Sequence, residues 1–208
     1  MRFKSARILN LSKCFAVSVI FLIGACSSDD PKLTNKTEEI TMPIATISTS
    51  LGNIELELDA QSAPITTKNF IDLANAGYYE NTIFHRVIEG FMIQGGGLDK
   101  DMNNKPSGSS SITNEANNGL KNDRGTVAMA RTNDPHSATS QFFINHKDNE
   151  FLNFTSETPQ GWGYAVFGNV IKGMDIVDQI AEVNTTTVNQ YQDVPVDTIT
   201  IKSVSINE

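Results

Sequence analysis

The chain has 208 residues, of which 39% are hydrophobic and 19% are charged, and its formal net charge at pH 7 is −8. This length accommodates one domain of ordinary size with a full hydrophobic core, and the composition excludes a collagen, a coiled coil and a wholly disordered chain. Residues 1–25 contain four basic and no acidic side chains (+4), which leaves −12 for the rest. Because so acidic a body repels phosphate backbones, we expect no nucleic acid partner.

The N-terminus has the pattern of a secretory signal. A basic segment over residues 1–13 is followed by twelve largely apolar residues, 14–25. A helix needs about 20 residues to span a bilayer, so this run is too short for a mature transmembrane helix. A buried N-terminal helix is disfavoured, because the run has no polar face and polar residues follow it at once. A basic segment before a short apolar run is typical of a signal peptide, which we predict over residues 1–25.

The signal ends in a pattern for lipid attachment. Ile23-Gly24-Ala25-Cys26 resembles the lipobox of bacterial lipoproteins. The resemblance implies cleavage before the cysteine and a lipid on the Cys26 thiol, and several acyl chains hold a protein at a membrane far better than one. Ser27 then favours the outer membrane, facing the periplasm, over the inner membrane. We expect an exported, membrane-anchored lipoprotein, with a soluble secreted protein as the alternative.

The polar stretch that follows predicts a tether. Residues 26–42 are rich in Ser, Asp, Thr, Asn, Lys and Glu, so we predict a lipid-anchored flexible linker there and one globular domain at residues 43–208. The two cysteines, Cys14 and Cys26, both precede this domain, so no disulfide staples it.

The domain begins with a predicted hairpin and a predicted helix. Ile54, Leu56 and Leu58 alternate with acidic residues, which indicates a half-buried strand after the β-prone run 46–50 and the turn residues 51–53. Ser62 is expected to cap a helix with Pro64 in its first turn. The inward face of that helix and its glycine stop are Phe70, Leu73, Ala74 and Gly77.

The rest of the domain is β-rich. A second helix is predicted from about Met174 to Ala181, with Val177 and Ile180 facing inward. Short β-prone runs lie at 82–87, 91–94, 126–130, 141–145 and 165–170. The apolar residues of the last strand change phase, as a β-bulge would cause, between Ile199/Ile201 and Val204/Ile206. Many short strands and two helices suggest a closed barrel whose ends the helices plug, and we expect residues 96–124 to form a long functional surface loop.

One set of residues suits the binding of an extended peptide. Arg86 follows a strand-like run, and Phe91, Met92 and Phe143 are able to form an apolar slot, with Gln94 and Gln141 supplying neutral amides. Such a slot would take a ring, and the polar groups would take backbone carbonyls. The spacing alone does not bring these residues together.

Four sequence blocks stand out in this region: Phe84–Gly96 (FHRVIEGFMIQGG), Gly125–Arg131 (GTVAMAR), Ser140–Asn145 (SQFFIN) and Phe151–Gly168. In this order they resemble the cyclophilins, a family of peptidyl-prolyl cis–trans isomerases. The first block matches the family signature nearly completely over thirteen residues, and the resemblance covers roughly residues 44–207, closest to the bacterial single-domain branch. The resemblance implies a mainly β fold, a closed eight-stranded antiparallel barrel capped by two α-helices.

The resemblance also implies roles for residues. Arg86 and Gln94 are expected to be catalytic: Arg86 would donate a hydrogen bond to the proline nitrogen as the amide twists, and Gln94 would hold a substrate carbonyl. The substrates are expected to be proline-containing unfolded or folding polypeptides. The residues expected to bind them are Phe91, Met92, Ala130, Arg131, Gln141, Phe143, Phe151, Leu152 and Tyr164.

The sequence departs from many eukaryotic members at the pocket wall. Phe151 stands where they have Trp, and Tyr164 where they have His, while the Arg131-Thr132 pair replaces the Asn-Ala found in many relatives. Phe keeps the apolar wall but lacks the indole N–H, so we expect catalysis to survive and cyclosporin to bind weakly. The Arg131-Thr132 pair is expected to alter the preference for the residue before proline.

We expect a monomeric protein that needs neither a metal nor a cofactor. His85, His136 and His146 do not have metal-ligand spacing, and His85 is expected to be a buried hydrogen-bonding residue. Gly95-Gly96-Gly97 lacks the Lys-Ser/Thr of a phosphate loop and is expected to form a tight turn. Two alternatives remain: a tethered peptide-binding or chaperone module with a cyclophilin fold that needs little turnover, and a purely structural lipoprotein of the envelope.

Overall fold

A computed structural model describes residues 42–207 of the chain. The predicted signal peptide, the lipid site at Cys26 and the linker up to residue 41 lie outside the described residues. Within 42–207, no helix is long and apolar enough to cross a membrane.

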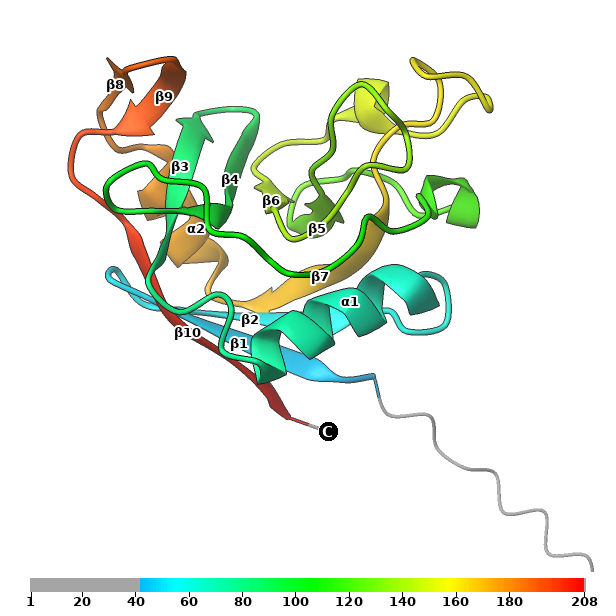
Figure 1. Ribbon diagram of the computed structural model, residues 1–208, viewed down its shortest axis with the longest axis horizontal. Helices are drawn as coiled ribbons and strands as arrows, with labels where there is room; N and C mark the ends of the chain where they lie inside the picture. The colour runs from blue at the N-terminus through cyan, green and yellow to red at the C-terminus, as the bar shows by residue number, and fades with distance from the viewer. Residues whose placement is uncertain (1–41, 208) are drawn as a thin grey trace, which may run out of the picture. The chain divides into compact units, whose positions relative to one another are not determined.

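The domain is a closed antiparallel barrel of eight strands, in the order β1-β10-β3-β4-β6-β5-β7-β2 (Figure 1). This confirms the predicted fold class. Its strands are β1 (Ile44–Thr49), β2 (Asn53–Leu58), β3 (Thr82–Ile88), β4 (Met92–Asp99), β5 (Thr126–Met129), β6 (Phe142–Asn145), β7 (Val166–Lys172) and β10 (Thr200–Asn207). The predicted hairpin is β1–β2, and each predicted β-prone run lies in a strand or overlaps one.

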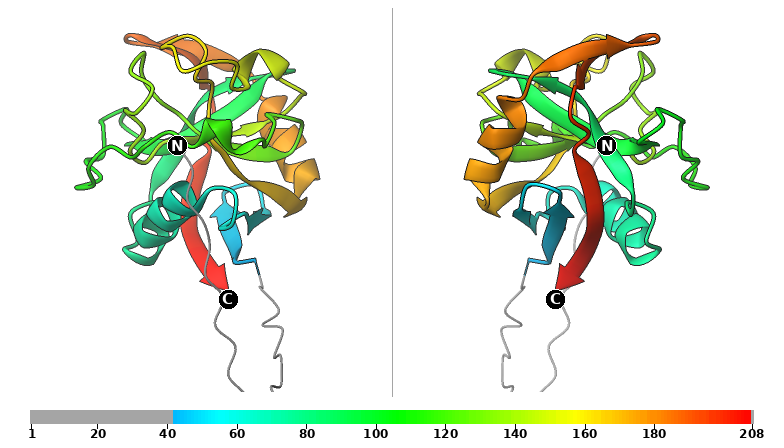
Figure 2. Two further views of the ribbon diagram at one scale, coloured as in Figure 1. Left: turned by 90° about the vertical axis from the view of Figure 1, so that its right-hand side faces the viewer. Right: turned by 90° about the vertical axis from the view of Figure 1, so that its left-hand side faces the viewer.

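Two helices pack against different strands of the barrel (Figure 1, Figure 2). Helix α1 (Pro64–Asn75) contacts β7 and β10, whereas α2 (Met174–Ala181) contacts β2, β3 and β4. The predicted inward faces are confirmed, since both helices contribute to one core cluster with the inward residues of the strands. The buried helix residues are Phe70, Leu73 and Ala74 of α1 and Val177, Ile180 and Ala181 of α2.

The N-terminus of α1 is capped from a distant loop. The prediction that Ser62 caps this helix is wrong: Ala63 is the N-cap residue, and it makes no side-chain capping bond. Instead, the Glu115 carboxylate accepts hydrogen bonds from the backbone N–H groups of Ile65 (3.1 Å) and Thr66 (2.8 Å). The first-turn donors of Ile65 and Thr66 are therefore satisfied by a group 50 and 49 residues further along the chain.

The glycine run is part of a strand. Gly95, Gly96 and Gly97 lie inside β4, so the predicted tight turn is wrong. The pairing of β3 with β4 shifts register on both sides of Phe84, and Gly96 adopts a φ of +80° in the irregular part. A Cβ atom on Gly96 would lie 2.8 Å from the Phe142 ring, so this close approach requires glycine.

The predicted phase change in β10 is a bulge. Ser48 of β1 pairs with Ser203, but Thr49 pairs with Ile201, so one residue of β10 has no partner. This bulge lets Ile201 and Val204 both face the core, as predicted.

Two further segments were not placed correctly from the sequence. The stretch expected to be a loop from residue 96 begins only after β4 ends at Asp99, and it contains a short 3₁₀ helix (Ala116–Asn118) and buried Asn114 and Asn122. An additional hairpin of β8 (Thr185–Val188) and β9 (Tyr191–Pro195) forms a separate two-stranded sheet. It was missed because β8 is a mostly exposed TTTV run without alternating polarity.

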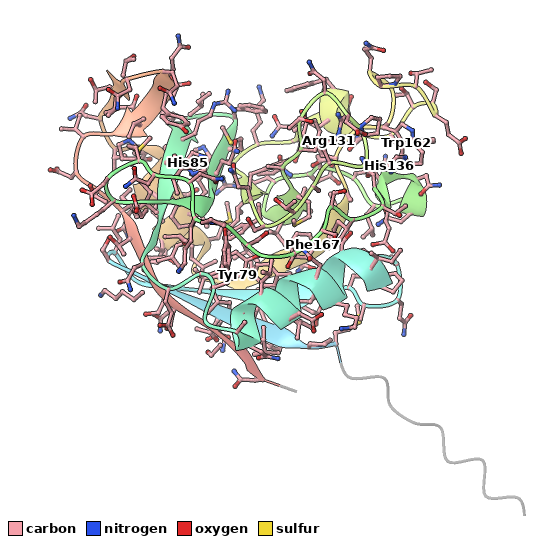
Figure 3. The ribbon with its side chains drawn as sticks, in the orientation of Figure 1. Tyr79, His85, Arg131, His136, Trp162 and Phe167 are labelled. Atoms are coloured by element: carbon pink, nitrogen blue, oxygen red, sulfur yellow. The ribbon has the colours of Figure 1, made fainter. Side chains whose placement is uncertain are left out.

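His85 is a buried histidine in β3, labelled in Figure 3. Its side chain is almost fully buried, and within residues 42–207 its Nδ1 atom has no hydrogen-bond partner. Burial lowers the pKa of His85 from 6.5 to about 4, although a hydrogen bond with the Ile83 backbone offsets part of this effect. The folded protein therefore holds His85 neutral where the unfolded chain protonates it.

Replacing His85 should flatten the pH dependence of stability. Since the folded pKa is about 4 and the unfolded value 6.5, the unfolded state binds more protons between these values, and stability falls as the pH falls through this window. When the pH falls from 7.5 to 5, protonation of His85 in the unfolded state should lower the free energy of unfolding of the wild type by about 2 kcal/mol. A His85→Gln variant should not show this decrease. Urea denaturation at the two pH values measures the difference, and parallel losses in both proteins would contradict the expectation.

Replacing Glu115 should destabilise the protein through α1. A Glu115→Ala variant leaves the first-turn N–H groups without their carboxylate, and we expect the free energy of unfolding to fall by about 1–2 kcal/mol. Ser62→Ala is the matched control and should change it by less than about 0.5 kcal/mol, because the Ser62 side chain does not cap the helix. Equal losses in chemical denaturation of the two variants would refute this account of the cap.

Candidate functional site

Four residues on four adjacent strands lie in one row across the barrel. Arg86 of β3 pairs with Gln94 of β4, Gln94 pairs with Phe143 of β6, and Phe143 pairs with Ala128 of β5. Directly opposed residues on neighbouring strands have side chains on the same face, about 5 Å apart. The barrel therefore brings together residues that are up to 57 positions apart in the sequence.

A bulge in β3 produces this alignment. Phe84 pairs with Gly95, and Arg86 pairs with Gln94, so His85 is an extra residue on β3. Phe84 and Val87 both lie in the barrel core, although strict alternation would put residues three apart on opposite faces. The bulge corrects the phase, and Arg86 consequently lies on the outer face.

The outer face carries its own hydrophobic cluster. Met92, Ala128 and Phe143 pack with Leu152 and Val166, and they form a cluster separate from the barrel core. Their neighbours in the strands, such as Ile93, Val127 and Ile144, belong to the core instead. Alternation along each strand thus builds both clusters, one inside the barrel and one outside.

A pocket of about 140 Å³ opens above this outer cluster. Its floor is apolar, and Arg86, Gln94 and Arg131 add polar groups. Seven of the residues expected from the resemblance to bind substrate line it together with both expected catalytic residues. The lining residues are Arg86, Phe91, Met92, Gln94, Ala130, Arg131, Phe143, Leu152 and Tyr164.

Two of the expected substrate-binding residues lie beside the pocket instead of lining it. Gln141 lines a neighbouring cavity of about 150 Å³ that shares Gln94, Ala130 and Arg131 with the first. Phe151 is 75% exposed, and its ring stacks on Phe91 with 5.6 Å between centroids. An extended chain in the first pocket would therefore have a second cavity next to Gln94, Ala130 and Arg131, and an exposed aromatic ring next to Phe91.

The two glutamines of the site are joined to each other. Gln94 Nε2 donates a hydrogen bond to Gln141 Oε1 at 3.0 Å, which leaves the second N–H of the Gln94 amide free to donate. The Gln141 side chain occupies the space that a Cβ atom on Gly97 would need, so the glycine in β4 makes room for it.

Tyr164 forms one wall of the pocket and is held on two sides. Its ring packs edge-on against Phe143, with 5.6 Å between centroids, and the Arg131 guanidinium lies 4.7 Å from its ring centre. Arg131 also donates hydrogen bonds to the backbone oxygens of Gly163 (2.8 Å) and Pro159 (3.3 Å). The Arg131 side chain therefore braces the wall, a role that the sequence did not predict.

Three buried asparagines fix the remaining walls, and they too were missed. Asn122 donates to the backbone oxygens of Leu152 and Tyr164, and Asn145 donates to Asn122. Asn149 donates to the backbone oxygen of Phe91. Asn149 also donates to Asn145 Oδ1 (2.7 Å), which completes the network. The one local signal is that Asn145 ends the apolar run of β6; nothing near Asn122 marks it.

Arg86 lies at the edge of the pocket with its side chain 42% exposed. Its guanidinium carbon is 5.9 Å from the ring centre of Phe91, and its Nε atom is 3.8 Å from an oxygen of Asp193 in β9. Asp193 belongs to the hairpin that the sequence did not predict. Within residues 42–207, no group of three or more His, Cys, Asp or Glu side chains is placed to hold a metal ion.

The arrangement suits an extended peptide with a compact apolar ring. The floor would bury the ring, and the Gln94 amide and the Arg86 guanidinium supply donors at its edge. A guanidinium is permanently charged and offers several donors in a fixed geometry.

Comparison with known proteins identifies the family to which the chain belongs. The profile described as "Cyclophilin type peptidyl-prolyl cis-trans isomerase/CLD" matches residues 44–206. The peptidyl-prolyl cis-trans isomerase cyp18 of Streptomyces antibioticus is 58% identical over 165 residues, which cover 79% of this chain and 99% of that protein. Peptidyl-prolyl cis-trans isomerase B of Escherichia coli K12 is 54% identical over 165 residues, 79% of this chain and 100% of that protein.

The fold is similar to solved structures as well. A cyclophilin type peptidyl-prolyl cis-trans isomerase of Cryptosporidium parvum, crystallised in the presence of the dipeptide Ala-Pro, is 31% identical with a TM-score of 0.65. The match covers 79% of this chain and 99% of that structure. Barrel, pocket and sequence agree, and the chain belongs to the cyclophilin-type peptidyl-prolyl cis-trans isomerase family.

Proposed function

We propose that this isomerase acts on X–Pro bonds in the pocket beside Arg86. The observation that carries the proposal is the direct cross-strand pairing of Arg86 and Gln94 at a cavity of about 140 Å³ that is also lined by Met92, Phe143 and Leu152. Its relatives at 54–58% identity carry the name of this activity.

The chemistry is a rotation and needs no nucleophile. Turning an X–Pro bond faces a barrier of about 20 kcal/mol, because the resonance of the amide is lost. As planarity breaks, the proline nitrogen becomes pyramidal, and its lone pair becomes able to accept a hydrogen bond. Arg86 donates that bond, and since the acceptor exists only near the transition state, the interaction lowers the barrier without tightening ground-state binding.

The other residues hold the substrate while it rotates. The proline ring lies over Met92, Phe143 and Leu152, and burial of this ring fixes one end of the bond. Gln94 uses the N–H that Gln141 does not occupy to hold a backbone carbonyl. The chain on the other side of the bond is then free to turn beneath Arg86.

An Arg86→Ala variant should lose most activity. We expect kcat/KM for a proline tetrapeptide to fall by about 100- to 1000-fold, the loss typical of removing one transition-state donor. Residues 27–208 are a suitable protein, because 165 residues of this chain match the whole length of the Escherichia coli isomerase. Lys172→Ala is the control, since Lys172 pairs with Glu55 on β2, outside the pocket lining, and should retain wild-type activity.

A peptide-binding module with little turnover is the second candidate. The exposed Phe151 ring stacked on Phe91 favours it, since this platform serves binding without a part in the rotation. Folded wild-type protein that binds a proline peptide in calorimetry but leaves its isomerisation rate at background would replace the first candidate with this one.

We also propose that the protein is exported, carries a lipid on Cys26 and works on exported polypeptides from the outer membrane, as a monomer. The basic and apolar N-terminal segments, the Ile23-Gly24-Ala25-Cys26 pattern and the Ser27 that follows it support this placement.

A Cys26→Ser variant of the full chain should leave the membrane. In a bacterial host, we expect wild type in the detergent-soluble membrane fraction, with a mass increase on the N-terminal peptide that matches a diacylglyceryl cysteine. The variant should lack that mass and lose the membrane association that the lipid provides. Cys14→Ser is the matched control and should behave as wild type. Wild-type protein that is fully soluble and unlipidated would favour the secreted form.

A further inference from the structure

The β8–β9 hairpin brings a carboxylate to the expected catalytic arginine. A carboxylate oxygen of Asp193 in β9 is 3.8 Å from Arg86 Nε. Among residues 42–207, Asp193 is the one acidic residue within 4 Å of that guanidinium. The hairpin lies beside β3, the strand that carries Arg86 (Figure 1, Figure 2). None of the four motif blocks contains this segment.

A bulge in β9 determines where Asp193 points. Val188 pairs with Tyr191 and Thr186 with Val194, so two residues of β9, one of them Asp193, oppose one residue of β8. Asp193 has a φ of +59°, in the left-handed region that residues with a Cβ rarely adopt. Bulges frequently redirect a side chain next to a functional site.

The bulge is held in place by burial of the strand that contains it. Val194, the next residue, is 5% exposed, and Pro195 is buried as well. The left-handed conformation at Asp193 is therefore fixed by the packing of its own strand. Aspartate and asparagine tolerate this conformation better than most residues, because their short side chains bond locally to the backbone.

The guanidinium of Arg86 is consequently held from two sides. The Phe91 ring lies 5.9 Å away on the pocket side, and Asp193 lies on the hairpin side. An ion pair through Nε leaves both terminal amino groups of the guanidinium available as donors. A free arginine side chain would lose rotational entropy each time it formed the transition-state bond.

We propose that Asp193 is a positioning residue that orients Arg86 for the isomerisation step. This inference rests on the proposed function of Arg86. Asp193 acts through the arginine and touches no substrate, so its loss slows turnover and leaves the affinity for the peptide unchanged. The two side chains are 42% and 39% exposed, so the effect of the pair is modest.

The test compares Asp193→Asn with Asp197→Asn. Asparagine removes the charge but still accommodates the left-handed backbone, so the bulge survives. Asp197 is exposed, lies four residues away and does not pair with Arg86, which makes it a matched control for the change in net charge. We expect kcat to fall about two- to fivefold in Asp193→Asn with KM unchanged, and neither constant to change in Asp197→Asn.

Two further measurements separate positioning from a general structural role. In an Arg86→Ala background, which lacks the guanidinium, Asp193→Asn should cause no further loss of the residual activity, because the two residues act as one unit. The Arg86 Nε–H signal in a ¹H–¹⁵N NMR spectrum should shift and broaden in Asp193→Asn and remain in place in Asp197→Asn. Full additivity of the losses, or an unchanged Nε–H signal, would overturn the inference.

The inference and the proposed function fail in different ways. Wild-type protein without isomerase activity would overturn the proposed function, and the Nε–H signal would still report whether Asp193 orients Arg86. Active wild type whose kcat is unchanged by Asp193→Asn would overturn the inference and leave the function of Arg86 intact.

Discussion

The register between β3 and β4 is the constraint on which the site depends. His85 is the extra residue on β3, and beyond it Arg86 faces Gln94. Because a shift of one residue moves every following side chain to the opposite face of a sheet, pairing without the bulge would send Arg86 toward the core and Val87 away from it. The bulged residue, His85, is itself buried and neutral. Protonation of this histidine would therefore lower the stability of the fold that aligns Arg86 with Gln94.

Because side chains alternate between the two faces of each strand, the same strands supply residues to the barrel core and to the pocket floor. Phe142 and Ile144 of β6 support the core, whereas Phe143 between them supports the pocket. A closed sheet makes this division sharp, since a barrel has no free edge along which the strands can slip. The pocket floor is consequently built from the same strands as the core behind it, which suits a reaction in which the enzyme contributes orientation and electrostatics and no bond chemistry.

The walls of the pocket come from loops, and buried polar contacts make those loops part of the fold. Asn122, Asn145 and Asn149 are nearly inaccessible and satisfy one another together with the backbone of Phe91, Leu152 and Tyr164. A fully satisfied buried network is rigid, while removal of one member would leave its partners unpaired. The segment expected to be a surface loop thus carries Asn122 into the site and Glu115 to helix α1.

The sequence by itself determined the class of fold, most of the local elements and the family. Alternation at Ile54, Leu56 and Leu58 requires a strand, the spacing of Phe70, Leu73 and Ala74 requires a helix, and the phase change in the last strand requires a bulge, because these are properties of a few adjacent residues. The motif blocks named the residues that the barrel then collected around one pocket, although no spacing showed that they would meet.

Only the tertiary structure decided how distant segments complete one another. Ser62 has the right chemistry to cap α1, but Ala63 occupies the N-cap position, and the first-turn N–H groups donate to the Glu115 carboxylate instead. In the sequence, the glycines of β4 have the pattern of a turn. In the structure, the Phe142 and Gln141 side chains leave no room for a Cβ atom on Gly96 and Gly97. Asp193 reaches Arg86 only because β9 folds back beside β3. Such contacts depend on strand register and barrel closure, which are set by the whole set of pairings and therefore leave no local pattern to read.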